Sequence, residues 1–248
     1  FKTSLDFYKI KCKIGKGCFG KVYLATQILT GCDVALKVIA KTNIRNKDSR
    51  RKIEKEVAIL KQVNNSRFVI KLLEVFEDEQ SVYLVFEHLS NGDLVQYFKK
   101  KPLFDEPELA PFFMKICKGV EYLHSNRILH RDIKLDNILF QDKDHTIIKI
   151  SDFGCSKNSI LGSTIIGTPK YMALEVLNEN EKYDYKADIW SFALCCWELL
   201  YGYGSFPFSL ASKKDLMNDI KQHSGESLRF PANPKFPAEV RDFFTRCL

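Results

Sequence analysis

The sequence predicts an α+β fold in two lobes, and the order of its hydrophobic patterns is the main evidence for it. Residues 1–87 contain short segments rich in Val, Ile, Leu and Tyr between glycine or polar turns, which predicts a small sheet. Residues 88–248 contain long segments with apolar residues at helical spacing. We therefore expect an N-terminal lobe at 1–87, a linker near 87–92 and a helical lobe at 88–248.

The expected elements can be placed along the chain from these patterns. Five strands are expected in the first lobe, at Tyr8–Ile14, Val22–Gln27, Asp33–Ile39, Leu72–Glu77 and Ser81–Glu87. A helix is expected at about 50–63, because Ile53, Val57 and Leu60 recur at helical spacing. The clearest features of the second lobe are helices at Pro107–Ser125 and Ala187–Tyr201 and short strands at Ile128–Leu129, Ile138–Phe140 and Thr146–Ile150.

The composition is that of an ordinary globular protein with an excess of positive charge. The 248 residues carry a formal net charge of +7, much of it at 41–61. That run is either a nucleic-acid or anionic-membrane patch or the solvated face of an amphipathic helix. No aromatic residues interleave the charges to stack on bases, which favours the helix face. We expect neither a nucleic-acid nor a membrane partner, and a salt-dependent titration would test the nucleic-acid alternative.

The cysteine pattern gives no support for a metal site. Eight cysteines occur without a C-x-x-C pair or an accompanying histidine cluster. No secretory signal is evident, and the longest apolar stretch, Ile189–Leu200, is too short to span a bilayer. Free thiols in a reducing compartment are therefore expected, which predicts a cytoplasmic protein with the nucleus as the alternative.

A glycine-rich segment joins the first two expected strands. Gly15, Gly17 and Gly20 let the backbone approach an anion closely, so that amide N–H groups can bind phosphate oxygens. Such a pattern also marks dinucleotide sites and ordinary hairpins. A dinucleotide site would place a helix directly after the glycines, whereas Val22 continues here as a strand.

Lys37 follows in the third expected strand, and an exposed strand lysine would be its simplest explanation. Glu54 and Glu56 lie on the next expected helix, and either carboxylate could pair with this lysine. Glu56 has the better register, because it faces the same side as the apolar residues of the helix.

The segment from His130 to Asn137 reads HRDIKLDN and carries the groups that phosphoryl transfer needs. The carboxylate of Asp132 can accept the proton of a hydroxyl nucleophile, Lys134 can neutralise the phosphoryl group, and the amide oxygen of Asn137 can bind magnesium. Asp152 opens an Asp-Phe-Gly tripeptide, where a carboxylate can hold magnesium between the phosphates.

In this order and at these spacings, the motifs resemble those of eukaryotic protein kinases across nearly the whole chain. The resemblance implies the two-lobed protein kinase fold, with ATP in the cleft between the lobes and Mg²⁺ as the cofactor. It implies an ATP site formed by Ile14, Gly15, Gly17, Gly20, Val22, Ala35, Lys37, Phe86, Glu87, Leu89, Asp93 and Leu139. Within this set Phe86 would be the gatekeeper, the backbone at Glu87–Leu89 would bind adenine, and Asp93 would lie near the ribose.

The same resemblance assigns the catalytic roles. Asp132 would be the base, Lys134 the phosphate-stabilising lysine, and Glu56 the helix partner of Lys37. Asn137 and Asp152 would bind magnesium, and Asp188 would brace the catalytic loop.

Two segments resemble the serine/threonine form of the family. They are the catalytic loop D-I-K-x-x-N at 132–137 and the segment GTPKYMA at 167–173, in which Thr168 would bond Asp132 and Lys134. The implied reaction is transfer of the ATP γ-phosphoryl group to Ser or Thr hydroxyls of protein substrates. The overall pattern is closest to the calmodulin-dependent and AMP-activated-like group.

Regulation and substrate preference are further expectations from the resemblance. Thr164 lies where many such kinases carry an activating phosphothreonine, which implies an upstream activating kinase. Arg131, Lys157 and Lys52 would surround its phosphate. Asp93 and Asp136 occupy positions where related kinases bind basic residues upstream of the target hydroxyl.

The sequence departs from the family at several positions. Ala173-Leu174-Glu175 replaces the usual Ala-Pro-Glu, and Ala193 replaces a glycine in the central helix. The chain stops before the segment that normally supplies an arginine partner for Glu175, so we expect a kinase domain truncated at its C-terminus. These departures leave open a pseudokinase scaffold that binds partners without turnover. A small-molecule kinase is the less favoured alternative, because the segment at 167–171 argues for a protein substrate.

Overall fold

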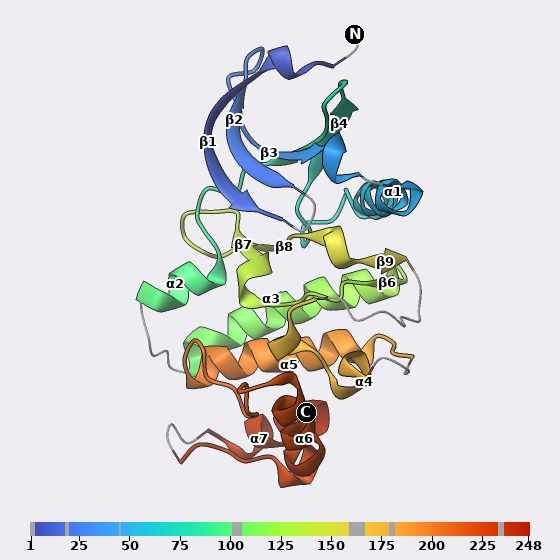
Figure 1. The fold of residues 1–248 in the computed structure, drawn as a ribbon. Helices are drawn as coiled ribbons and strands as arrows, with labels where there is room; N and C mark the ends of the chain where they lie inside the picture. Colours follow the sequence, from blue (N-terminus) through green and yellow to red (C-terminus); the bar gives the residue numbers. More distant parts are fainter. Residues whose placement is uncertain are drawn as a thin grey trace.

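The computed structural model describes residues 3–17, 20–44, 46–100, 106–158, 167–178, 182–232 and 236–248. Figure 1 shows a sheet with one flanking helix above a larger body of helices. The sheet has five antiparallel strands in the order β1-β2-β3-β5-β4, with bounds β1 Tyr8–Lys16, β2 Lys21–Gln27, β3 Asp33–Ala40, β4 Leu72–Glu77 and β5 Ser81–Glu87. This arrangement confirms the expected fold class.

Helix α1, Lys47–Gln62, packs its apolar side toward the core and exposes its charged side. It begins three residues earlier than expected, because the side chain of Asn46 accepts a hydrogen bond from the Ser49 N–H at 2.9 Å and caps the helix. Ile53, Ile59 and Leu60 are buried, and Glu56 is the one charged residue of the described helix that is buried with them. The expected amphipathic helix is confirmed, although only part of the positive run at 41–61 belongs to it.

Helices dominate the second lobe (Figure 1). Its helices are α2 Leu94–Lys100, α3 Glu106–Ser125, α4 Leu174–Leu177, α5 Lys186–Tyr201, α6 Lys213–His223 and α7 Ala238–Cys247. Two short antiparallel pairs join β6 Ile128–Leu129 to β9 Lys157–Asn158 and β7 Ile138–Phe140 to β8 Ile148–Ile150. None of the described helices is long and apolar enough to cross a bilayer.

Helix α5 forms the centre of this lobe and is buried on nearly all sides. Trp197 is 1% exposed and packs against Tyr201, Phe230 and Phe244, whose ring centroids lie within 5.6 Å of its own. A helix that is apolar all round is expected to lie in the core of a large domain. The buried side chains of Asp188, Ser191 and Glu198 on α5 have hydrogen-bond partners inside the protein, and Asp188 and Glu198 bear on the site described below.

The two lobes are joined by hydrogen bonds as well as by the connecting chain. The Ile150 N–H donates to the Phe68 carbonyl at 2.8 Å, and the Ile70 N–H donates to the Ile150 carbonyl at 3.0 Å. Strand β8 is shorter than the expected Thr146–Ile150, because the N–H groups of Thr146 and Ile147 donate to the Asp142 carboxylate in a turn. The loop that follows β8 is therefore fixed to both lobes at once.

Candidate active site

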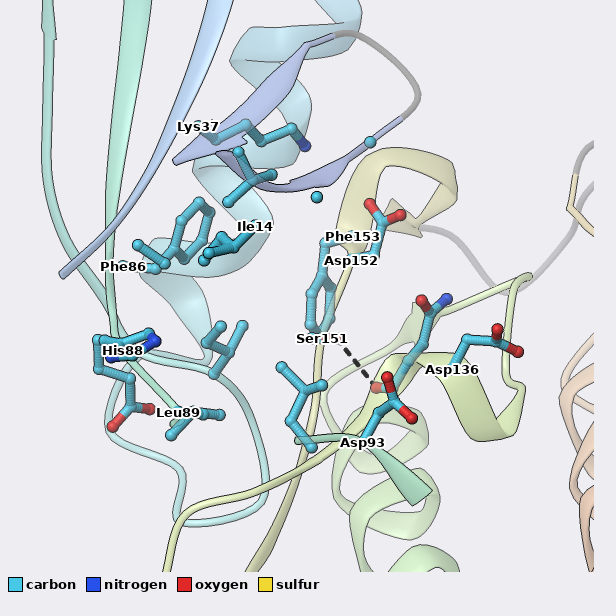
Figure 2. Close-up of a pocket in the computed structure, with 18 of the residues that line it drawn as sticks. Ile14, Lys37, Phe86, His88, Leu89, Asp93, Asp136, Ser151, Asp152 and Phe153 are labelled. Carbon is cyan, nitrogen blue, oxygen red and sulfur yellow. Dashed lines mark hydrogen bonds between the residues drawn. The ribbon is translucent and has the colours of Figure 1, made fainter. Parts of the chain in front are cut away.

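A cavity of about 470 Å³ lies between the two lobes and is lined by residues from both. Figure 2 shows Lys37 reaching into it from the sheet, with Asp152 and Phe153 on the opposite side. Its lining contains these residues of the predicted ATP site: Ile14, Gly15, Gly17, Val22, Ala35, Lys37, Phe86, Glu87, Leu89, Asp93 and Leu139. Its volume and mixed lining suit a small organic ligand with charged groups at one end.

The glycine-rich segment closes this cavity from above as the hairpin between β1 and β2. The Gly17 N–H donates to the Gly20 carbonyl at 2.9 Å, and a Cβ at Gly17 would lie 3.4 Å from Cε of Lys37. Gly20 is not part of the described lining. A Cβ there would lie 2.2 Å from the Val38 carbonyl oxygen, so this glycine allows the hairpin to pack closely on β3.

Lys37 and Glu56 form a buried ion pair between β3 and α1. Nζ of Lys37 lies 2.6 Å from Oε1 of Glu56, and the two residues are 5% and 3% exposed. Glu54, the other candidate, is exposed and pairs with Arg50 at 3.2 Å. The register argument for Glu56 is confirmed, and the pair fixes the ammonium group at the cavity wall.

Asp132 lies at the centre of a hydrogen-bonded cluster below the cavity. Its Oδ1 accepts from the Thr168 hydroxyl at 2.8 Å and the Thr168 N–H at 3.0 Å, and its Oδ2 lies 2.9 Å from Nζ of Lys134. Nζ of Lys134 also donates to Oγ1 of Thr168 at 2.8 Å, which closes a triangle of three side chains. The predicted contacts of Thr168 with both residues are therefore present.

The same cluster sets the protonation of Asp132. Burial by itself raises the pKa of Asp132, but hydrogen bonds from Lys134 and Thr168 outweigh it, so the pKa lies below the usual aspartate value. For Lys134, burial lowers the pKa, and the contact with Asp132 outweighs it in the upward direction. The pair is therefore charged at neutral pH, with a carboxylate able to accept a proton.

Asp188 positions this loop from the first turn of α5. It is 0% exposed and accepts hydrogen bonds from the backbone N–H groups of His130 at 2.9 Å and Arg131 at 2.8 Å. Arg131 has a φ of 68°, so its backbone turns sharply at this point. The predicted bracing role agrees with these contacts.

Gly167 approaches the same turn from the other side. A Cβ at Gly167, whose φ is 118°, would lie 2.3 Å from the Arg131 carbonyl oxygen. Only glycine fits both this conformation and this approach. The segment that carries Thr168 is thereby held against the loop that carries Asp132.

The residues expected to bind magnesium are the right kind for that ion. Both Asn137 and Asp152 line the cavity, and the amide nitrogen of Asn137 donates to the carbonyl and to Oδ2 of Asp132 at 2.8 and 3.0 Å. This leaves the Asn137 amide oxygen as an acceptor in the cavity that the Asp152 side chain also lines. Mg²⁺ is commonly bound by one or two protein oxygens together with substrate phosphates. No cluster of three or more His, Cys, Asp or Glu side chains suited to a metal occurs among the described residues.

Some lining residues were missed by the sequence reasoning. Leu60, Ile70 and Phe153 complete the inner wall of the cavity. Leu60 lies one turn beyond Glu56 on the same face of α1, and this spacing could have predicted it. The carboxylate of Glu87 forms an ion pair with Lys149 and accepts from the Lys71 N–H at 2.7 Å, a set of contacts without a signal in the sequence.

The predicted regulatory residues are only partly described. Arg131 donates from Nε to the Cys155 carbonyl at 2.5 Å, and its guanidinium also contacts the Tyr183 hydroxyl at 3.3 Å. Lys157 lies on β9, and Lys52 is exposed on α1. Thr164 lies outside the described residues.

Comparison with known proteins agrees with this geometry. The protein kinase domain family matches residues 8–248. The chain is 36% identical over 245 residues to calcium-dependent protein kinase 5 of Plasmodium berghei (strain Anka), which covers 96% of this chain and 42% of the relative. It is 34% identical over 231 residues to human NUAK family SNF1-like kinase 1, which covers 92% of this chain and 34% of the relative.

The chain thus spans less than half the length of these two relatives. Both are kinases of the group that its sequence pattern resembles. A match over nearly the whole chain, together with the Lys37–Glu56 pair and the Asp132 cluster, shows that this chain belongs to the protein kinase family.

Proposed function

We propose that this domain is a serine/threonine protein kinase that transfers the γ-phosphoryl group of ATP to hydroxyl groups of protein substrates. The observation that carries the proposal is the triangle of Asp132, Lys134 and Thr168 beside a nucleotide-sized cavity. The Lys37–Glu56 pair is formed at the same time, so both halves of the site are assembled together.

The residues suggest a direct transfer. Oδ of Asp132 accepts the proton of the substrate hydroxyl as its oxygen bonds to the γ-phosphorus and the bond to the β,γ-bridging oxygen breaks, releasing ADP. Lys134 stabilises the negative charge of the transferring group, and Lys37 holds the α- and β-phosphates. Asn137 and Asp152 would hold Mg²⁺, which would supply positive charge to the phosphates.

Thr168 supports the assignment to Ser and Thr acceptors. Its hydroxyl contacts both Asp132 and Lys134, so it fixes the base and the phosphate-binding lysine relative to each other. The Plasmodium relative named above is a protein kinase by its name, which supports a protein substrate for this domain as well.

Substrate preference can also be proposed from charge. Asp93 and Asp136 both line one end of the cavity (Figure 2). Burial raises the pKa of Asp93, and the charge of Asp136 adds to this effect, as expected for two carboxylates near each other. A cationic side chain would relieve that repulsion, which supports a substrate with a basic residue upstream of its acceptor.

Activation by phosphorylation of Thr164, by an upstream kinase, is part of the same proposal. Its support is the position of Thr164 three residues before Gly167 and the meeting of the elements that carry the expected cations. Helix α1, with Lys52, lies against β9, with Lys157, and β9 pairs with β6 just before Arg131.

Asp132→Asn should lower kcat by about 10²–10⁴-fold, because the amide cannot accept the substrate proton. Transfer from labelled ATP to a serine peptide, with magnesium present, measures this. Nucleotide binding should be retained, since Asp132 is not part of the described cavity lining. If the unmodified domain binds ATP and transfers nothing to any Ser or Thr peptide, a pseudokinase is the better explanation.

Thr168→Ala should lower kcat/KM by about 10–100-fold, since small displacements of reacting groups cost this much. It should also move the acid limb of the pH–rate profile to higher pH. The hydroxyl lowers the pKa of Asp132, so without it Asp132 becomes protonated, and activity is lost, at a higher pH. Thr168→Ser keeps the hydroxyl and serves as the control. An acid limb that stays in place in Thr168→Ala would contradict this role.

Thr164→Ala should lower activity by about tenfold or more, which corresponds to the loss of one charge-assisted hydrogen bond. The comparison requires protein that has first been treated with an activating kinase extract and ATP. Ser163→Ala is the matched control, because it removes the neighbouring hydroxyl only. Equal activity of Thr164→Ala and the parent, with phosphate present on Thr164 of the parent, would exclude this mode of activation.

Asp93→Asn should reduce the preference for a basic residue upstream of the acceptor by about tenfold at one peptide position, as expected for the loss of one ion pair in a partly buried site. A peptide array with arginine at each upstream position measures the preference. Asp242→Asn, an exposed change on α7, is the control. An array with no preference for upstream Arg or Lys would rule out the basic-directed specificity.

A further inference from the structure

Lys170 occupies an unusual environment two residues beyond Thr168. Its ammonium nitrogen lies 4.8 Å from the ring centroid of Tyr171, 4.7 Å from that of Phe206 and 5.7 Å from that of Tyr203. It also lies 3.8 Å from Oε1 of Glu198, whose side chain is fully buried. We call these four residues, Tyr171, Tyr203, Phe206 and Glu198, the cation cage.

The cage has the chemistry of a binding site for a cation. Aromatic faces attract positive charge, and the attraction grows when the cation is partly desolvated. Burial raises the pKa of Glu198 above its usual value, and hydrogen bonds from Tyr171 and the Gly204 N–H and the charge of Lys170 offset this only in part. A buried carboxylate in this position is stabilised as an anion by whichever cation fills the cage.

The cage lies against helix α2, which begins directly after Asp93, because Nζ of Lys99 on this helix lies 4.8 Å from the ring centroid of Tyr203. Tyr203 is 40% exposed, and burial raises the pKa of its hydroxyl, with the charges of Asp136, Glu198 and Asp93 adding to the effect. The Tyr203 hydroxyl is therefore exposed to the negative charge of all three carboxylates. The chain that carries Lys170 comes directly from Thr168, which contacts Asp132. A peptide whose hydroxyl reaches Asp132 passes close to this surface.

We propose that Lys170 fills, from within the chain, a subsite that would otherwise bind a basic side chain of the substrate. The inference deepens the proposed function and rests on it, since it supposes a peptide lying beside Asp132. The domain then selects a basic residue through Asp93 and Asp136 alone, and a second arginine gains nothing at the cage. Lys170 is a specificity-determining residue by exclusion, because its side chain is 30% exposed and competes directly with the substrate.

A purely structural role for Lys170 makes the opposite prediction. If the lysine only holds the turn Pro169–Tyr171 in place, then removing it can weaken peptide binding but cannot improve it. If it occupies a substrate subsite, removing it creates affinity for an additional cation at one peptide position. The sign of the change therefore separates the two explanations.

The test compares Lys170→Ala, which vacates the cage, with Lys170→Met, which removes the charge but keeps a side chain of similar length among the rings. Labelled peptides carry one upstream arginine, alanine in place of the acceptor serine, and a second arginine moved through every remaining position. Their dissociation constants are measured by fluorescence anisotropy with ADP and magnesium present, so that no turnover is needed. Lys186→Ala, at an exposed lysine of α5, is the matched control.

The second arginine should change peptide affinity by less than about twofold at every position in three proteins: the parent domain, the Lys186→Ala variant and the Lys170→Met variant. In Lys170→Ala it should tighten binding by about tenfold at a single position, which corresponds to one cation–π and carboxylate contact. Tyr203→Leu added to Lys170→Ala should remove most of that gain, and because Tyr203 is partly exposed, this double variant should fold. Thermal unfolding confirms that each variant is folded.

The proposal is overturned if Lys170→Ala, folded, shows no position of gain or binds none of the peptides, or if the parent already shows the same gain. Phosphorylation of the matching serine peptides is measured separately. Absence of transfer by the parent would contradict the proposed kinase activity, whereas a gain in peptide affinity without transfer would leave the subsite standing.

Discussion

The contact on which the rest of the site depends is that of the buried Asp188 carboxylate with the turn at His130–Arg131. A carboxylate that is 0% exposed must be fully hydrogen-bonded, since an unpaired charge inside a protein is costly. Two backbone N–H groups and Nε2 of His124, at 2.9 Å, meet that requirement. Because both backbone donors come from one turn, they fix its shape, including the positive φ of Arg131. The residue that follows, Asp132, leaves this turn toward Thr168 and the cavity. The central helix of the lobe therefore sets the direction of the proposed base without touching it.

The turn at His130–Arg131 is also connected to the N-terminal lobe, through the His130 side chain. His130 is 0% exposed, and burial lowers its pKa, so that the ring is neutral. A neutral ring with its proton on Nε2 donates to the Ser151 carbonyl at 3.1 Å and accepts at Nδ1 from the Asp132 N–H at 3.3 Å. Ser151 precedes Asp152 and Phe153, and the short helix that contains Phe153 lies against α1. Since α1 also carries Glu56, the base, the expected metal ligand and the Lys37 pair belong to one connected set of contacts. A displacement of α1 would disturb all of them together.

The sequence pattern predicts a contact correctly where the spacing of residues within one helix, strand or loop determines that contact. Glu56 rather than Glu54 could be chosen because helical register places it on the buried face, and Thr168 because its segment resembles a known loop. Helix α1 begins about one turn before the position that its apolar pattern predicts, because the Asn46 side chain caps the helix outside that pattern. Contacts between residues far apart in sequence were not predictable in this way. The pairing of Glu87 with Lys149 and the cage around Lys170 each join separate loops, and only the folded chain brings their members together.

Short-range electrostatic contacts, rather than the net charge of the protein, decide whether a basic peptide binds near the site. The chain as a whole carries a net charge of +7, so a basic peptide is repelled at long range. At physiological ionic strength such repulsion is screened beyond roughly 8 Å, and contacts inside that distance decide binding. The negative charges of Asp136, Glu198 and Asp93 all act to raise the pKa of the Tyr203 hydroxyl. Lys134 compensates Asp132, and Lys170 compensates Glu198, on either side of Thr168. The Asp93–Asp136 pair remains available to a cationic substrate. Lys170 therefore narrows the choice of substrate without altering any group that takes part in the transfer.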